Sequence, residues 1–373
     1  MILQLISLVN FKNHELLKVN FSKNINCFLG NNGVGKTNLL DAIYYLSFCK
    51  SYFNSTENHN IHYGSNYFMI KGDYVNQQKV HNQVDCSLTE GRKQFKFNGK
   101  KYSKLSHHIG KIPLVIITPF DANIILGGSE ERRRFFDKLL SQLDNNYLLN
   151  LISYNRILRQ RNTLLKDASL KSINEDLLLS YDNALHEFGS KIYAKRKECL
   201  GLLINSFQNY YDIISEKNEK VNIHYKSELQ NNYLNDILIQ NRTKDKILMY
   251  TSSGVHRDDF IFTINSHNLK KNGSQGQQKT FLISLKFAYF DVLNKHHQSC
   301  PILLLDDIFD KLDHDRVSQI IKILNTNQFG QIFITDTNFE RISSIMNQLN
   351  SNCKYFMFNK NGLYEETFKS EKN

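Results

Sequence analysis

The sequence predicts an α/β fold in which a large, mainly helical lobe is inserted into a sheet-containing domain. Three observations support this prediction. Residues 25–48 read as a buried apolar strand, a glycine-rich loop and a helix. The apolar run at 302–305 ends in two acids, as a buried strand does where it reaches the edge of a sheet. Between these segments, from about 130 to 248, apolar residues such as Phe135, Leu139 and Leu143 recur at helical spacing.

We therefore expect residues 1–125 and 249–373 to form the two halves of one lobe and 126–248 to form the insertion. The first stretch reads as strands, apart from one helix from about 37 to 48. Within it, Asn98-Gly99 between alternating residues predicts a hairpin. The last stretch alternates strands and helices, with strands at 329–335 and 355–358. A length of 373 residues exceeds one ordinary domain, which agrees with an inserted lobe.

Composition indicates a cytoplasmic protein with a basic surface. The six cysteines are scattered without a C-x-x-C pair, which indicates neither a zinc site nor a disulfide framework. The chain begins with a strand-like alternation rather than a signal peptide, and no apolar run is long enough to span a membrane, so we expect no membrane partner. The net charge of +11 suits a polyanionic partner. A lysine- and asparagine-rich composition of the kind an AT-rich genome produces competes as the explanation.

The glycine-rich loop follows the pattern G-x-x-x-x-G-K-T between a strand and a helix. It consists of Gly30, Asn31, Asn32, Gly33, Val34, Gly35, Lys36 and Thr37. Main-chain N–H groups of such a loop surround phosphate oxygens, and the helix dipole adds positive potential. We expect Lys36 to reach the β- and γ-phosphates of ATP and the Thr37 hydroxyl to ligate Mg²⁺.

The two acids after the apolar run are Asp306 and Asp307. A strand of an α/β sheet presents ligand-binding groups at its carboxyl end. We expect Asp306 to hold Mg²⁺ through water and Asp307 to orient or deprotonate the attacking water, which would make Lys36 and Asp307 the catalytic pair.

The spacing of the motifs selects the class of ATPase. Lys36 and Asp306 are 270 positions apart, so a large insertion must separate them. About thirty residues before Asp306, the sequence Ser-Gln-Gly-Gln-Gln opens a helix, with Ser274, Gly276 and Gln277 as its nucleotide-binding candidates. It is similar to the signature of ABC ATPases, which caps the nucleotide of a partner subunit. A polar helix cap is the alternative interpretation. The segment 310–313 is similar to the D-loop of this class, and Thr335-Asp336-Thr337 lies where a histidine usually senses the γ-phosphate.

Further elements resemble the RecF family of bacterial recombination mediators, within the ABC-type, SMC-like ATPases. Residues 8–14 are similar to its N-terminal element, in which Lys12 would lie near the nucleotide. Residues 127–137, 158–165 and 254–259 match three more elements, with Ser129 and Val255 where the family has proline. The resemblance spans most of the chain.

Membership would imply an ABC-type, SMC-like ATPase head with an inserted helical lobe. It would also imply an ATP-dependent homodimer that binds duplex DNA near gaps and single-strand junctions. Such a dimer works with RecO and RecR to help load RecA, in DNA repair, the SOS response and replication, with slow hydrolysis as a switch.

Two clusters are candidates for DNA contacts. Lys96, Lys100, Lys101 and Lys104 belong to the predicted hairpin and its flank, with His107, His108 and Lys111 following. Lysines interleaved with aromatic residues suit phosphate contacts, although a solvated strand face is an equal alternative. Arg156 and Arg159, with Arg161, lie on the inserted lobe. We expect Arg132, Arg133 and Arg134 to be structural.

The alternative function is that of an SMC-like or nuclease-associated DNA-repair ATPase of another family. It would require a sustained heptad arm or a cluster of metal-binding acids after the core, and the sequence contains neither. An ABC transporter ATPase is disfavoured by the variant signature and the helical lobe.

Overall fold

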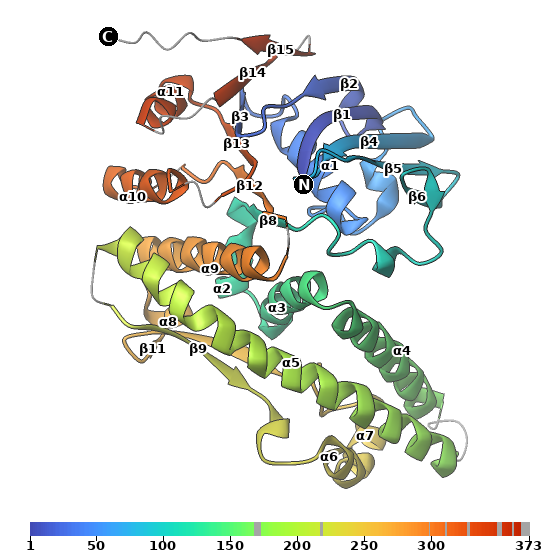
Figure 1. Cartoon of the computed structure of the whole chain (residues 1–373). Helices are drawn as coiled ribbons and strands as arrows, with labels where there is room; N and C mark the ends of the chain where they lie inside the picture. Colours follow the sequence, from blue (N-terminus) through green and yellow to red (C-terminus); the bar gives the residue numbers. More distant parts are fainter. Residues whose placement is uncertain are drawn as a thin grey trace. The chain divides into compact units, whose positions relative to one another are not determined.

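The computed structural model describes residues 1–167, 173–216, 219–297, 299–309, 312–326, 329–348, 353–359 and 362–366. The chain divides into two compact units (Figure 1). The first comprises Met1–Asp121, Ile213–Ser215 and Tyr289–Asn373, and the second Ala122–Asp212 and Glu216–Ala288. The second unit thus extends to 288, whereas the inserted lobe was expected to end at 248. The reason is that β10 (Asp259–Ile264) pairs along its length with β9 (Val221–Lys226), which ties residues after 248 to the helical segment.

Two six-stranded sheets form the described part of the first unit. The antiparallel sheet has the order β2-β1-β4-β5-β6-β7, and the other, mainly parallel, has the order β15-β14-β3-β13-β12-β8. The antiparallel strands are β1 Ile2–Phe11, β2 His14–Asn20, β4 Tyr67–Val75, β5 His81–Thr89, β6 Arg92–Phe97 and β7 Lys100–Lys101. The remaining strands are β3 Ile25–Leu29, β8 Leu114–Ile117, β12 Ile302–Asp306, β13 Ile332–Asp336, β14 Cys353–Asn359 and β15 Gly362–Glu366. Because β3, β12 and β13 are parallel neighbours, their carboxyl ends meet at one edge.

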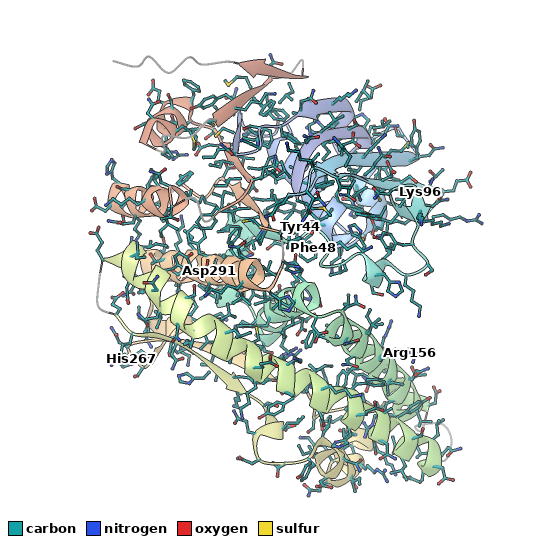
Figure 2. The ribbon with its side chains drawn as sticks, viewed as in Figure 1. Tyr44, Phe48, Lys96, Arg156, His267 and Asp291 are labelled. Atoms are coloured by element: carbon teal, nitrogen blue, oxygen red, sulfur yellow. The ribbon has the colours of Figure 1, made fainter. Side chains whose placement is uncertain are left out.

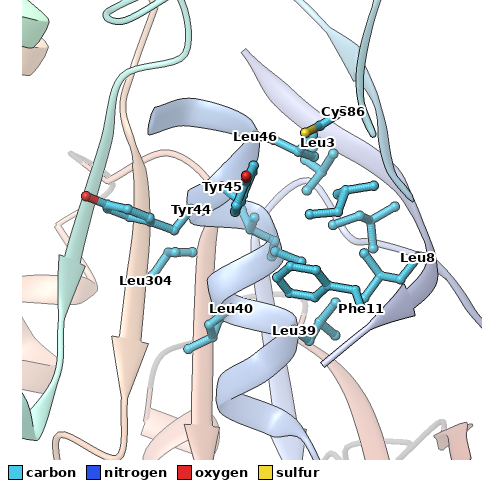
Figure 3. Close-up of a cluster of buried hydrophobic side chains, with 14 of the residues drawn as sticks. Leu3, Leu8, Phe11, Leu39, Leu40, Tyr44, Tyr45, Leu46, Cys86 and Leu304 are labelled. Carbon is cyan, nitrogen blue, oxygen red and sulfur yellow. The ribbon is translucent and has the colours of Figure 1, made fainter. Parts of the chain in front are cut away.

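Helix α1 (Lys36–Phe48) lies between the two sheets and is buried on nearly all sides. In Figure 3, Leu39 and Phe11 face one another on the side of β1, while Leu40 and Tyr44 lie toward Leu304 of β12. A helix that is apolar around its circumference is stable only inside a core. This packing fixes the first turn of α1 against the edge where the parallel strands end.

The second unit is mainly helical, as expected. Its elements are α2 Ala122–Leu126, α3 Ser129–Leu143, α4 Asn145–Asp167, α5 Glu175–Ser215, α6 Leu234–Gln240, α7 Arg242–Leu248, β11 His267–Asn268, α8 Leu269–Asn272 and α9 Gln275–His296. Helices α5 and α9 continue into the first unit, which also holds α10 His314–Leu324 and α11 Phe339–Gln348. Short 3-10 helices cover Glu57–Asn60, Leu105–His107, Pro119–Asp121 and Glu228–Gln230.

One strand contradicts the helical prediction for 130–248. β9 alternates buried and exposed residues, and it pairs with β10, whose other neighbour in the three-stranded sheet is β11. The alternation Val221, Ile223, Tyr225 has a period of two, which is the pattern of a half-buried strand. In the described part of the chain, no helix has the length and apolar character needed to cross a membrane.

Candidate nucleotide site

The phosphate-loop segment follows β3 and leads directly into α1. Gly30, Gly33 and Gly35 have φ angles of 145°, 83° and 109°. A Cβ on Gly35 would lie 2.6 Å from side-chain atoms of Asn13 and of His14, and one on Gly30 would clash with the carbonyl of Phe358. Residues 30 and 35 therefore require glycine for both conformation and space.

Lys36 points back over this loop. Its ammonium donates to the main-chain carbonyls of Gly30 at 2.7 Å and Asn31 at 3.0 Å, and the residue is 5% exposed. Burial lowers the pKa of Lys36, while the nearby carboxylates of Asp307, Asp306 and Asp336 oppose that effect. The loop thus holds one buried cation at the place where phosphate charge would be bound.

Thr37 and Asp306 are brought together from opposite ends of the chain. The Thr37 hydroxyl donates to Oδ1 of Asp306 at 2.9 Å, and the Thr335 hydroxyl donates to the same oxygen at 2.7 Å. Burial raises the pKa of Asp306, and the hydroxyls of Thr335 and Thr37, followed by Lys36, counteract the shift. A carboxylate and a hydroxyl are oxygen ligands of the kind that Mg²⁺ prefers. The described residues contain no group of three or more His, Cys, Asp or Glu side chains that would hold a metal alone, so phosphate oxygens and water would complete its shell.

Asp307 stands at the carboxyl end of β12 in a left-handed conformation, with φ 47°. Its main-chain N–H donates to the Thr335 hydroxyl at 3.1 Å. Left-handed backbone at a residue other than glycine costs free energy and is concentrated at functional sites. The conformation turns Asp307 away from the strand direction, immediately after the Asp306 that contacts the phosphate-loop threonine.

The segment 335–337 gives one contact that the sequence left open. Thr335 reaches Asp306 and Asp307, while the buried Asp336 pairs with Arg341 at 2.6 Å. Thr335 therefore joins the site, although sequence analysis did not name it as a site residue. Its only signal was its place at the end of a buried strand.

Residues 12–14 also lie against the phosphate loop. Lys12 was expected near the nucleotide, and its ammonium pairs at 2.6 Å with Asp41, one helical turn beyond Thr37. Nε2 of His14 lies 3.1 Å from the Gly35 carbonyl, and burial lowers the pKa of His14. Asn13 accepts from Asn38 at 2.7 Å. Asn13 and His14 thus support the loop, a role that sequence analysis missed because it depends on the turn between β1 and β2.

The signature-like motif opens α9 in the second unit. The Ser274 hydroxyl accepts from the Gln277 main-chain N–H at 3.2 Å, and the Gln277 side-chain oxygen accepts from the Ser274 N–H at 2.8 Å. This reciprocal pair is a capping box, so the helix-cap interpretation holds. Gly276 lies in the first turn, where main-chain amides have no acceptor within the helix. Of the D-loop segment 310–313, positions 310 and 311 lie outside the described residues, and Asp313 caps α10 by accepting from Arg316 N–H at 2.9 Å.

The hairpin expected at 92–102 is present as β6 and β7. Lys96 lies opposite Lys101 and Phe97 opposite Lys100, and Lys96, Lys100, Lys101 and Lys104 are exposed. Figure 2 shows Lys96 projecting outward from the hairpin. His108, expected beside them, is instead fully buried, with Nε2 2.7 Å from the Leu46 carbonyl. The lysines remain candidates for DNA contacts, whereas His108 belongs to the core.

On the second unit, Arg156 and Arg159 are exposed on α4, where Figure 2 labels Arg156. They line a depression of about 340 Å³ with Gln160, Thr163 and Tyr181. Arg161, expected with them, is completely buried and bonds Asp182 and Asp245, each at 2.7 Å. It cannot contact DNA, because its guanidinium is enclosed between two carboxylates.

Two of the three neighbouring arginines join elements within the second unit. Arg132 contacts both carboxylate oxygens of Asp259, and Arg133 donates to the Asp258 carbonyl at 2.6 Å. Arg134 is exposed and pairs with Glu130 and Glu131 on its own helix. The structural role expected for this run is therefore the observed one for Arg132 and Arg133, within the second unit.

Comparison with known proteins places this geometry in a family. Residues 2–361 match the model of the RecF/RecN/SMC N terminal domain. The chain is 46% identical over 357 residues to the DNA replication and repair protein RecF of Bacteroides fragilis (strain YCH46), covering 95% of this chain and 96% of that protein. The RecF of Flavobacterium johnsoniae is 47% identical over 353 residues, with 94% and 98% covered.

Solved structures agree. The recombination mediator protein "RecF-ATP in RecFOR pathway" superposes with a TM-score of 0.89 at 30% identity, covering 98% of each chain. The Smc head domain of Pyrococcus furiosus, at 15% identity and a TM-score of 0.59, shares the fold. The α/β, ABC-type head predicted from two distant motifs is thus confirmed, and the sequence identity over almost the whole length is what separates one branch of that fold from the others: this chain belongs to the RecF family.

Proposed function

We propose that this protein is an ATP-dependent DNA-binding protein of recombinational repair and replication-fork maintenance. The observation that supports it best is the convergence of Lys36, Thr37 and Asp306 at one sheet edge, from segments 269 positions apart in the case of the Thr37–Asp306 hydrogen bond. The RecF relatives act by name in DNA replication and repair, and the neighbour of TM-score 0.89 is a RecF–ATP structure.

ATP binds at the loop 30–37, where Lys36 neutralises the β- and γ-phosphates and the loop amides surround them. Thr37 and Asp306 hold Mg²⁺, which neutralises charge on the phosphate oxygens when bound. Asp307 orients the attacking water and accepts its proton, while Thr335 fixes both acids. Lys12 stabilises the start of α1 through Asp41.

A second copy completes the site. Ser274, Gly276 and Gln277 at the start of α9 present a hydroxyl and free helix amides to the nucleotide of the partner, so ATP promotes a homodimer. Hydrolysis separates the two copies and acts as a switch, for which a slow rate suffices.

The dimer binds duplex DNA near single-strand gaps and junctions. The exposed lysines of the β6–β7 hairpin and, on α4, Arg156 and Arg159 supply phosphate contacts. In the cytoplasm, with RecO and RecR as partners, the complex helps load RecA. We infer these partners from the family and from the RecFOR pathway named for the neighbouring structure.

The substitution Ser274→Arg tests the central claim. A bulky cation at the start of α9 should prevent ATP-induced dimerisation, while each monomer still binds ATP at its own loop. Light scattering with and without ATP, beside a fluorescence titration of nucleotide, measures both. Ser180→Arg, at an exposed position on α5, is the matched control. Loss of ATP affinity in the Ser274 variant would place Ser274 at the nucleotide of its own chain, and normal dimerisation would leave the motif as a helix cap only.

A further inference from the structure

Glu219, just before β9 in the second unit, contacts the start of the signature helix. Its Oε1 accepts from the side-chain amide of Gln277 at 2.8 Å, and its Oε2 accepts from the Tyr211 hydroxyl at 2.7 Å. Gln208 on α5 donates to the main-chain carbonyl of Glu219 at 3.0 Å. Both carboxylate oxygens and the main chain of Glu219 are therefore held in place.

This contact sets which end of the Gln277 side chain faces the helix. A carboxylate only accepts hydrogen bonds, so the NH₂ group of Gln277 must point at Glu219. The side-chain oxygen of Gln277 then points the other way and accepts from the Ser274 N–H at 2.8 Å. If Gln277 were reversed, its NH₂ group would face that N–H, and two donors would oppose one another. Glu219 thus decides whether the capping box can form.

The capping box in turn determines which groups of the motif remain for a ligand. The N–H groups of Ser274 and Gln277 are used within the box. The N–H groups of Gln275 and Gly276, in the first turn, have no acceptor inside an α-helix, and the Ser274 hydroxyl still has its proton to donate. These three donors point out from one well-defined helix start, which suits phosphate oxygens.

We propose that Glu219 is a positioning residue for the signature motif: through Gln277 it holds the start of α9 in the conformation that closes on the partner's nucleotide. The brace behind it is α5, because Gln208 and Tyr211 lie near the end of that 41-residue helix. The proposal rests on the dimer proposed above, but the orientation of Gln277 is a property of one chain.

An exchange of the two groups tests this directly. Glu219→Gln removes the acceptor that orients Gln277, and Gln277→Glu sets two carboxylates against each other. The double variant restores one carboxylate and one amide in reverse: Glu at 277 accepts both from the Ser274 N–H and from Gln at 219. Glutamate is as good a capping-box residue as glutamine.

Each single variant should weaken ATP-dependent dimerisation by about tenfold, within the range of coupling between residues in contact, and the double variant should return to within about twofold of the unmodified protein. ATP affinity of the monomer should not change in Glu219→Gln, because the phosphate loop is untouched. Glu198→Gln, an exposed position on α5 paired with Lys195, is the matched control. Dimerisation of Glu219→Gln at the original strength, or a double variant no better than the worse single one, would overturn the proposal.

A second measurement separates this proposal from the dimer itself. Hydrogen exchange of the Ser274 and Gln277 amides, in protein without ATP, should accelerate in Glu219→Gln and recover in the double variant. Unchanged exchange overturns the positioning role. Altered exchange together with normal dimerisation of Ser274→Arg supports the positioning of Gln277 while refuting the proposed dimer site.

Discussion

At the scale of single residues, Asp307 offers a clean separation of charge from conformation. Its φ of 47° is a conformation that aspartate and asparagine adopt more readily than other residues with a side chain. Asp307→Asn therefore keeps the backbone and the hydrogen bond from its N–H to Thr335 while removing the carboxylate. ATP should still bind, and hydrolysis should fall by roughly 10²–10⁴-fold, the usual contribution of a general base.

The measurement is single-turnover hydrolysis beside dimer lifetime in ATP, which we expect to lengthen. Asp315→Asn, exposed on α10, is the control for removal of an acid in the same unit. Hydrolysis of the Asp307 variant at the original rate would show that another group activates water.

Residues of the site were predictable to the degree that their chemistry is local. Lys36 and Thr37 stand in a contiguous motif, and Asp306 ends an apolar run. Thr335 and Glu219 were not predictable in the same way, because each matters only through partners 29 and 58 positions away. No local pattern marks such a residue.

At the scale of elements, the β6–β7 hairpin presents a row of exposed lysines. Replacing Lys96, Lys100, Lys101 and Lys104 together by glutamine should weaken DNA binding and flatten its salt dependence. The slope of log K against log salt should fall by roughly 0.9 for each phosphate of duplex DNA that the variant no longer neutralises. The matched control replaces four exposed lysines of the same unit elsewhere: Lys18, Lys23, Lys71 and Lys79. If the two variants bind DNA with equal affinity and slope, the hairpin is a solvated face.

The same hairpin is fastened to the core by His108. Its Nε2–H donates to the Leu46 carbonyl at 2.7 Å, so Nδ1 is the acceptor that faces the Tyr102 hydroxyl at 3.2 Å. Burial lowers the pKa of His108 from 6.5 to about 4, with Lys111 adding to the effect and the Leu46 carbonyl opposing it. The neutral imidazole thus satisfies both neighbours, and protonation in the folded state is disfavoured.

A stability change with pH follows. Because the folded pKa lies below the unfolded one, the unfolded chain binds more protons between pH 6.5 and 4, and the stabilisation present above pH 6.5 is lost as the pH falls through that range. At pH 5 the loss from His108 is about 2 kcal/mol. His108→Gln keeps a donor for Leu46 and should lose correspondingly less stability between pH 7.5 and 5 in urea titrations. His107→Gln, exposed beside it, should behave like the unmodified protein. Equal pH dependence in all three proteins would contradict the assignment.

Elements with a strong period were predicted well, and β9 was not. The helix of the phosphate loop, the hairpin and the strands β12 and β13 each combine a period with a turn or motif at one end. β9 lies within a long helical stretch, and its alternation covers only Val221–Lys226. Such a short run is decided by its partner β10, 33 or more positions farther along.

At the scale of the whole molecule, the division into units follows strand pairing rather than motif order. The sequence suggested a return to the first lobe at 249 because strands and helices alternate again from there. The structure keeps 249–288 with the second unit, since β10 pairs with β9 and since Arg196 on α5 bonds both Asp258 and the Val255 carbonyl. One consequence is that the signature motif and the phosphate loop belong to different units of the same chain.

Because the two motifs are separate, two inactive variants should complement one another when mixed. Lys36→Ala removes the one positive side chain of the loop aimed at the phosphates, so it should not bind ATP, but its α9 start is intact. Ser274→Arg binds ATP but cannot close on a partner. In a two-fold dimer each composite site takes its loop from one copy and its signature from the other. A heterodimer of the variants therefore contains one complete site, formed by the loop of the serine variant and the signature of the lysine variant.

Neither variant alone should dimerise or hydrolyse ATP, whereas an equimolar mixture should do both, with at most about half of the original activity because one site in two is complete. The assay is ATP hydrolysis beside light scattering across mixing ratios, with a maximum expected at equal amounts. A control mixture of Lys36→Ala with Lys36→Ala/Ser274→Arg should stay inactive, since it contains no intact loop. If the first mixture is also inactive at every ratio, the motif does not act across the dimer. If Ser274→Arg hydrolyses ATP unaided, the site is complete within one chain and the ABC-type arrangement does not apply to it.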